Sequence, residues 1–149
     1  MKTIIIYPNN DPFSDDIIDE IEKTNKFNFK IIKNSKFDYY ICLLKNSIFL
    51  IGNSSGGIIE TPSLGIPNIL VGSRQVGREI AFNTIVTKIN KYSIKKGINK
   101  VLNDKKYLQR CKLLNSPYLP NNNIFPSKKI TKILNRININ QIKDKQITF

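Results

Sequence analysis

The chain has 149 residues, about the size of one domain, and 40% of them are apolar, which is enough for a hydrophobic core. It carries 24 Lys and Arg against 11 Asp and Glu, a net charge of +13, and it has no His. The lack of His excludes the commonest general base near neutral pH, so catalysis would need carboxylates or groups from another chain or segment.

Cysteines and apolar segments indicate where the protein works. Cys42 and Cys111 stand alone without metal-ligand spacing, and two lone thiols suit a reducing compartment better than a disulfide framework. The apolar run at residues 3–7 is too short for a signal peptide, and no segment approaches the roughly 20 apolar residues of a membrane span. We expect a cytoplasmic protein with no membrane partner, no metal and no other cofactor.

The positive charge invites a nucleic-acid interpretation. However, most of it is Lys spread along the whole chain beside Asn and Ile, as compositional drift in an A+T-rich genome would produce. No recognition-helix pattern or aromatic-rich binding strand accompanies it. Nucleic-acid binding is therefore the weakest of the functional hypotheses.

Apolar runs and turn residues predict strands that alternate with helices. Strands are expected at residues 3–7, 28–32, 47–51, 68–71 and 84–88. Helices are expected at residues 14–26, 38–46, 55–64, 94–102, 104–114 and 128–137. Residues 8–12 and 115–127 are rich in Pro and Asn and are expected to be loops.

Local signals refine these elements. The first strand is a continuous apolar run, which is typical of burial on both faces. Ser14 and Ser93 are expected N-caps, Gly65 is an expected C-cap, and Pro62 should keep its helix short or kinked. Two helices have apolar faces that are expected to point inward, formed by Ile94, Ile98, Val101 and Leu102 and by Ile130, Ile133, Leu134 and Ile137.

This alternation predicts an α/β fold, a Rossmann-like parallel sheet with helices on both faces. No repeat or low-complexity linker interrupts it, so one domain is expected at residues 1–138, followed by a polar tail at 139–149. Ligands of such sheets bind at the carboxyl ends of the strands. The Ser/Gly turn that follows residue 51 and the loop that follows residue 71 both belong there.

The Ser/Gly turn is the first part of a candidate site. Ser54, Ser55 and Gly56 open a helix, so backbone N–H groups and hydroxyls point at one spot that suits a phosphate. Small residues also let a ligand approach the backbone closely. The alternative is that Ser and Gly serve only to cap the helix, and the turn alone does not decide between these interpretations.

Three charged residues extend the candidate site. Glu60 lies six residues after Ser54, about 9 Å along a helix axis, which is close to the span from a diphosphate to the ribose hydroxyls. Arg74 and Arg78 follow the next strand, and Arg fits phosphate oxygens bidentately. Taken singly, each could equally be a solvated surface residue.

Together these residues carry a family resemblance. The motifs are Gly-Asn-Ser-Ser-x-Gly-x-x-Glu from residue 52, Gly-Ile-Pro from residue 65 and Gly-Ser-Arg-Gln-x-Gly-Arg-Glu from residue 72. They resemble the hydrolysing UDP-N-acetylglucosamine 2-epimerases, most closely the branch that feeds sialic-acid and related nonulosonate synthesis. The likeness covers roughly residues 3–104 and, more loosely, the final helix.

The resemblance implies a fold and roles for the site. It implies most of the C-terminal half of a two-domain GT-B fold, with UDP-sugar in the cleft between the domains. Ser54 and Ser55 would contact the UDP phosphates, Glu60 would hold the ribose, and Arg74 would lie at the nucleotide. Arg78 matches the end of the same motif, and its role stays open.

The sequence also departs from the family pattern. The family's first domain is missing, together with the first strand and helix of its second domain, so residue 3 coincides with that domain's second strand. A His-Arg motif and the acid/base carboxylates fall in the missing part, and a Tyr-Gly-x-Gly loop before the last helix has lost its glycines here. The family's reaction, elimination of UDP followed by hydration, needs a base that this chain lacks.

The sequence therefore predicts the UDP-sugar-binding half of an epimerase-like protein that is inactive alone and has no catalytic residue of its own. Its expected ligands are UDP and UDP-N-acetylglucosamine. A complementing N-terminal chain and a second copy of the chain are the further partners considered. The alternative is a non-catalytic nucleotide-sugar-binding module.

Overall fold

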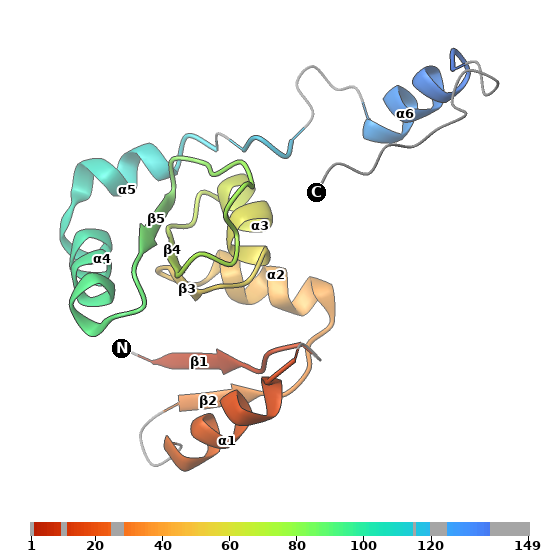
Figure 1. Cartoon of the computed structure of the whole chain (residues 1–149). Coiled ribbons are helices and arrows are strands. Elements are labelled where there is room, and N and C mark those ends of the chain that lie inside the picture. The colour runs from red at the N-terminus through yellow and green to blue at the C-terminus, as the bar shows by residue number, and fades with distance from the viewer. Residues whose placement is uncertain (1, 10–11, 25–28, 115, 120–124, 138–149) are drawn as a thin grey trace. The chain divides into compact units, whose positions relative to one another are not determined.

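The computed structural model describes residues 2–9, 12–24, 29–114, 116–119 and 125–137. Contacts group the chain into two compact units, Met1–Ser47 and Ile48–Phe149. Each unit contains a parallel sheet, and strands alternate with helices along the chain as the sequence predicts (Figure 1). None of the helices in these ranges is long and apolar enough to cross a membrane.

The first unit is built on a two-stranded sheet. β1 (Thr3–Ile6) pairs in parallel with β2 (Phe29–Ile32), and α1 (Ser14–Thr24) connects them. The expectation that the first strand is buried on both faces is wrong, because Ile4 and Ile6 are 43% and 37% exposed. The two-residue period of a strand sends both to one face, and an apolar run does not show whether anything covers that face.

A second helix ends the first unit. α2 (Phe37–Lys45) begins one residue before the predicted start, and its Leu44 is buried. The helix closes with the Asn46 side chain, whose amide donates to the carbonyl of Cys42 at 2.8 Å. The Cys42 thiol is exposed, whereas that of Cys111 in the second unit is buried, so the two cysteines are structurally unlike each other.

The second unit has a three-stranded sheet in the order β3-β4-β5, with all strands parallel. Its strands are β3 (Leu50–Gly52), β4 (Asn68–Val71) and β5 (Thr84–Thr87). β4 lies in the middle, and Asn68, Ile69 and Leu70 are almost completely buried there. The predicted bounds of β4 agree with the structure because Pro67 and Gly72 delimit the apolar run.

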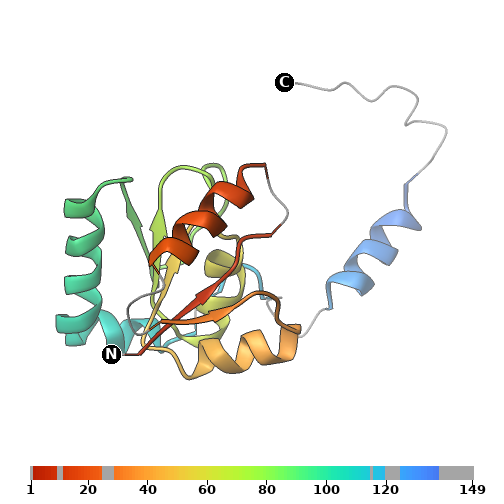
Figure 2. The same cartoon turned by 90° about the horizontal axis from the view of Figure 1, so that it is seen from below.

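Helices cover this sheet on both sides, as predicted. α3 (Gly56–Leu64) contacts all three strands, and α4 (Lys91–Asn103) contacts β4 and β5 (Figure 1). Figures 1 and 2 agree that α4 runs along β5. A methyl group on Gly97 would meet Ile69 and Thr87 at 3.3 and 3.2 Å, so α4 approaches the sheet closely because this residue has no side chain.

The core of the second unit lies between the sheet and the helices that follow it. Ile69, Val101, Tyr107 and Cys111 form its buried cluster, and Tyr107 and Cys111 belong to α5 (Lys105–Cys111). The predicted inward positions of Val101 and Ile98 are confirmed, but Leu102 is 45% exposed. Leu102 follows Val101 by one residue and is therefore turned about a quarter of the way around the helix.

Helix ends show which local signals were sufficient. Gly65 adopts the left-handed conformation at φ +68° and ends α3, as predicted. Ser93 is not an N-cap. Asn90 is, because its side-chain oxygen accepts from the Ser93 N–H at 2.8 Å and α4 begins one turn earlier than predicted. The Ser93 hydroxyl instead accepts from the Lys88 N–H.

The last described helix, α6 (Pro126–Leu134), starts within the predicted loop and ends before the predicted end at residue 137. The expectation that its apolar positions point inward is wrong, because these side chains are exposed in the structure. The side chains concerned are 38–62% exposed: Ile130, Ile133, Leu134 and Ile137. The 3.6-residue period shows which face is apolar but not what covers it. The predicted domain boundary at residue 138 lies outside the described residues and stays a prediction.

Candidate functional site

The turn between β3 and α3 carries the predicted phosphate-binding residues. Asn53, Ser54 and Ser55 follow the carboxyl end of β3, and α3 begins at Gly56. Ser54 is exposed, whereas Ser55 and Gly56 are half-buried. Ser55 occupies the N-cap position, but its hydroxyl makes no capping hydrogen bond. Capping therefore does not account for this hydroxyl, which stays available to a ligand.

Backbone hydrogen bonds tighten the start of α3. The Gly57 N–H donates to the Ser54 carbonyl at 3.2 Å, and the Ile58 N–H donates to the Ser55 carbonyl at 2.9 Å. The Ser54 hydroxyl oxygen accepts from the Gly56 N–H at 3.3 Å. The partial positive charge of the helix N-terminus therefore lies beside two serine hydroxyls at the carboxyl end of a parallel strand, where an anion is favoured.

Glu60 stands on the same helix and is half-buried. Its Oε2 atom is inaccessible to solvent and has no hydrogen-bond partner in the part of the chain that the structure describes. Burial raises the pKa of the Glu60 carboxyl, and a hydrogen bond from its own backbone N–H partly opposes that shift. A buried acceptor without a donor is unfavourable, so this oxygen is suited to a donor brought by a ligand, such as a hydroxyl.

Gln75 joins the two loops of the site. It lies in the turn that follows β4 and is only 5% exposed. Its Nε2 donates to the Asn53 carbonyl at 2.8 Å, while its buried Oε1 has no partner among the described residues. Sequence reasoning did not select Gln75, although it lies inside the quoted Gly-Ser-Arg-Gln motif, because a glutamine carries no charge and has no characteristic spacing.

Arg74 and Arg78 flank this glutamine. Both are exposed, and the turn that carries them includes Gly77 at φ +86° and a hydrogen bond from the Arg78 N–H to the Gln75 carbonyl at 3.2 Å. The Gln75–Asn53 bond holds the arginine loop against the serine loop. The structure thus brings the two predicted loops together, while Glu60 stands apart from them on the body of α3.

A third segment reaches the arginine loop. The Tyr118 hydroxyl donates to the Glu79 carbonyl at 2.9 Å. Tyr118 belongs to the stretch where the family's Tyr-Gly-x-Gly loop has lost its glycines, so this segment contacts the loop next to Arg78 even without them.

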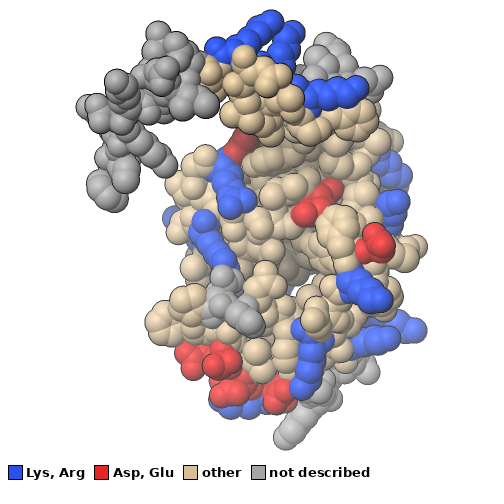
Figure 3. Space-filling model, turned by 90° about the vertical axis from the view of Figure 1, so that its right-hand side faces the viewer, with Lys and Arg blue, Asp and Glu red and all other residues tan. Residues whose placement is uncertain are grey.

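On the face drawn in Figure 3, Lys and Arg side chains are scattered among uncharged and acidic ones. The described residues contain no group of three His, Cys, Asp or Glu that could hold a metal ion.

Known proteins are similar to this chain in sequence. The family model described as UDP-N-acetylglucosamine 2-epimerase matches residues 1–135. The chain belongs to the UDP-N-acetylglucosamine 2-epimerase family. UDP-N-acetylglucosamine 2-epimerase of Neisseria meningitidis serogroup B is 42% identical over 84 residues, which are 56% of this chain and 22% of that protein. Polysialic acid biosynthesis protein P7 of Escherichia coli is 33% identical over 130 residues, 87% of this chain and 33% of that protein.

A hydrolysing relative and a solved structure extend the comparison. UDP-N,N'-diacetylbacillosamine 2-epimerase (hydrolyzing) of Legionella pneumophila is 34% identical over 107 residues, 71% of this chain and 28% of that protein. The S. aureus MnaA–UDP co-structure has a TM-score of 0.68 and 22% identity, covering 97% of this chain and 38% of that one. The predicted resemblance and the Rossmann-like fold are confirmed, and this epimerase-family chain spans between a fifth and a third of the curated relatives' length.

Proposed function

We propose that this chain is the UDP-sugar-binding half of a hydrolysing UDP-N-acetylglucosamine 2-epimerase-like protein and that it is inactive alone. The observation that carries the proposal is the buried Glu60 oxygen, which has no partner among the described residues and lies on the helix that begins at the Ser/Gly turn. A nucleoside diphosphate supplies the binding partners of both groups: its phosphates are an anion for the turn, and its ribose hydroxyls are hydrogen-bond donors for the carboxylate. Relatives named for UDP-hexosamine epimerisation support this choice of ligand.

Each site residue then has a defined role. The diphosphate accepts hydrogen bonds from the Ser54 and Ser55 hydroxyls and lies beside Gly56, at the positive end of α3. The ribose hydroxyls donate to the Glu60 carboxylate. Arg74 lies at the nucleotide, and Arg78 adds a second positive charge to the same loop.

The chemistry explains why the chain would be inactive alone. Loss of UDP from the sugar requires removal of a proton from C2 and stabilisation of the departing diphosphate. The site offers groups for the second task, but the chain has no His, and Glu60 is committed to the ribose. The base would come from a complementing N-terminal chain or from a second copy of this chain.

The cellular setting follows from the same proposal. The E. coli relative is named for polysialic acid biosynthesis, which supports a place in the sialic-acid and nonulosonate branch of the family. A UDP-sugar ligand also supports a cytoplasmic location. The alternative function, a non-catalytic nucleotide-sugar-binding module, uses the same residues and differs in that no partner chain would restore turnover.

Calorimetric titration with UDP tests the site directly. We expect wild-type chain to bind UDP, and we expect Glu60→Ala and Arg74→Ala each to weaken binding by roughly 1–3 kcal/mol, because each removes a charged hydrogen-bond partner of the ligand. Arg136→Ala removes an exposed positive charge two residues after the end of α6 and is the matched control. Binding that both site substitutions leave unchanged, in protein shown to be folded, would contradict the proposal.

A further inference from the structure

Gln75 is a buried side chain whose amide is only half used. Only 5% of the residue is exposed, and its Nε2 donates to the Asn53 carbonyl at 2.8 Å. Its Oε1 is inaccessible to solvent and accepts no hydrogen bond from the residues that the structure describes. Because a buried acceptor without a donor is unfavourable, this glutamine adds less stability than a fully bonded one would. Its presence therefore needs an explanation other than stability.

The Gln75 bond joins two loops that leave neighbouring strands. The serine loop, residues 53–55, follows β3, and the arginine loop, residues 73–79, follows β4. The two strands are parallel, with Gly52 opposite Leu70, so both loops leave the same edge of the sheet. Parallel neighbours are about 4.8 Å apart, so the loops start close together. Beyond the end of the ladder, the bond from Gln75 to Asn53 connects them.

Turn hydrogen bonds fix Gln75 relative to both arginines. The Val76 N–H donates to the Ser73 carbonyl at 2.9 Å. The Arg78 N–H donates to the Gln75 carbonyl at 3.2 Å, and Arg74 directly precedes Gln75 in the chain. A contact that holds the Gln75 side chain against the serine loop therefore also holds the backbone that carries Arg74 and Arg78.

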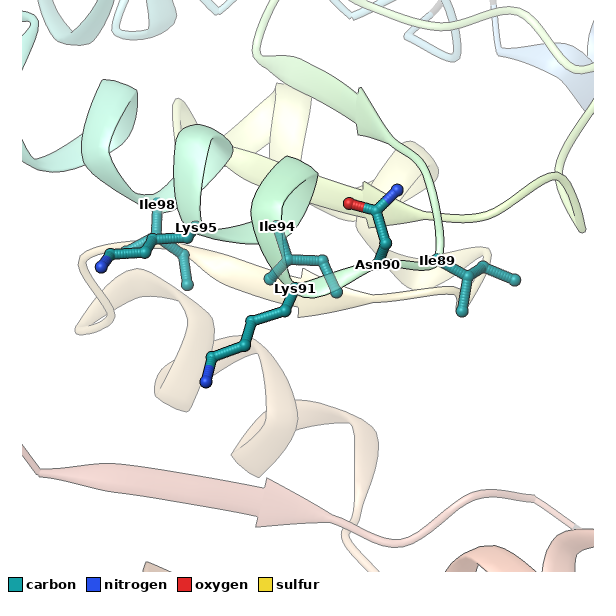
Figure 4. Close-up of a pocket in the computed structure, with 6 residues that line it drawn as sticks. All are labelled: Ile89, Asn90, Lys91, Ile94, Lys95 and Ile98. Carbon is teal, nitrogen blue, oxygen red and sulfur yellow. The ribbon is translucent and has the colours of Figure 1, made fainter.

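The groove drawn in Figure 4 is not where these groups lie. It runs along the start of α4 and is lined by Ile89, Asn90, Lys91, Ile94, Lys95 and Ile98. Ser54, Arg74 and Arg78 are instead exposed residues of the two loops. Their spacing therefore depends on contacts between the loops. A ligand that contacts both loops binds more tightly when this spacing is already set, because less order has to be created on binding.

We propose that Gln75 is the positioning residue of a diphosphate site: its amide holds the serine and arginine loops at the spacing at which one diphosphate contacts both. The inference rests on the proposed function and deepens it, because it concerns how the same loops are held. Gln75 itself does not bond the phosphates. Its Nε2 is used by Asn53, and its Oε1 is an acceptor, as the phosphate oxygens are. The amide acts through Asn53 and through the turn that carries Arg74.

Gln75→Met in the full chain tests the role in the unliganded protein. The variant loses one hydrogen bond but also the unpaired buried acceptor, and Asn53 is an exposed residue whose carbonyl can bond water instead. We therefore expect a urea midpoint close to that of wild type. Hydrogen exchange at the Gly57 amide, which donates to the Ser54 carbonyl, should become faster because the serine loop is released. Val76→Ala, at a neighbouring side chain that is 81% exposed, is the matched control and should change neither measurement.

Calorimetric titration with UDP and with inorganic diphosphate measures the effect on the ligand. We expect Gln75→Met to weaken the binding of both roughly tenfold, because both ligands need the same spacing of the loops. Val76→Ala should bind both like wild type. Glu60→Ala should weaken the binding of UDP alone, because inorganic diphosphate has no ribose.

A double-mutant cycle separates positioning from a general loss of structure. In the Gln75→Met background, Arg74→Ala should weaken UDP binding much less than it does in wild type, because the released loop no longer holds Arg74 at the diphosphate. Glu60→Ala should weaken UDP binding by the same factor in both backgrounds, since Glu60 stands on the body of α3. A general loss of structure would reduce the effects of both substitutions.

Three results would overturn the inference: UDP binding that Gln75→Met leaves unchanged, effects of Gln75→Met and Arg74→Ala that simply add, or a fall in the urea midpoint that accompanies the loss of binding. Wild type that binds inorganic diphosphate as tightly as UDP, with no effect of Glu60→Ala on either, would overturn the proposed nucleotide site alone. Folded wild type that binds neither ligand would overturn both.

Discussion

At the scale of single residues, Glu60 links stability to ligand binding. Its buried oxygen has no donor within the part of the chain that the structure describes, and burial raises the pKa of its carboxyl. The folded state therefore holds this proton more tightly than the unfolded state, and stability falls as pH rises from the ordinary Glu pKa of about 4.3 through the raised folded value. A ligand that donates to the carboxylate relieves this unfavourable state.

Glu60→Gln should therefore stabilise the unliganded chain at pH 7 while weakening UDP binding. We expect a gain on the order of 0.5–1 kcal/mol, a modest value because the residue is only half-buried. The gain should vanish near pH 4, where the wild-type carboxyl is protonated. Urea denaturation at both pH values measures it. A variant that is less stable than wild type at pH 7 would show that the carboxylate has a partner within the protein.

Tyr107 offers a second prediction at this scale. Its hydroxyl is buried and donates to the Asn83 carbonyl at 2.5 Å, and burial raises its pKa, so it remains a donor at alkaline pH. Tyr107→Phe should destabilise the chain by only about 1 kcal/mol, since the Asn68 N–H also donates to that carbonyl. Tyr92→Phe changes a side chain that is 79% exposed and should leave thermal stability unchanged. Equal effects of the two substitutions would contradict this account.

At the scale of elements, α6 differs from the helices that cover the sheet. None of its residues is buried, although its apolar positions have helical spacing. Ile130→Ala and Ile133→Ala should each change the free energy of unfolding by less than about 0.5 kcal/mol. Ile69→Ala, at a fully buried position of β4, should cost roughly 2–5 kcal/mol. A large effect in α6 would mean that another surface covers its apolar face.

Local signals predicted some elements well and others poorly. β4 was predicted with the correct bounds because a proline and a glycine enclose its apolar run. The start of α4 was missed because Asn90 and Ser93 are both good N-cap residues, and only their mutual hydrogen bond decides between them. Of the site, the serine and arginine loops were predictable from residue types, whereas Gln75 acts through a contact with Asn53, distant in sequence, that no local pattern reveals.

At the scale of the whole molecule, strand pairing is what sequence reasoning could not supply. The alternation of elements predicts one parallel sheet, whereas the five strands form separate sheets of two and three strands. Pairing joins residues distant in the chain, and each apolar run is compatible with more than one neighbour. The order within each of these two sheets fits part of a doubly wound fold, so the predicted Rossmann-like class holds while the choice of neighbours does not follow from local patterns.

Such a chain should be marginally stable or should associate. Far more large apolar side chains are exposed than buried among the described residues, and the edge at β3 is unpaired. We expect a free energy of unfolding below the usual range of about 5–15 kcal/mol, with a urea midpoint that rises with protein concentration as copies cover one another's apolar surfaces. Addition of the complementing chain should raise the midpoint further and remove its concentration dependence. A cooperative transition at the same midpoint over a hundredfold range of concentration, with ordinary stability, would contradict this expectation and would mean that the chain alone is a complete folding unit.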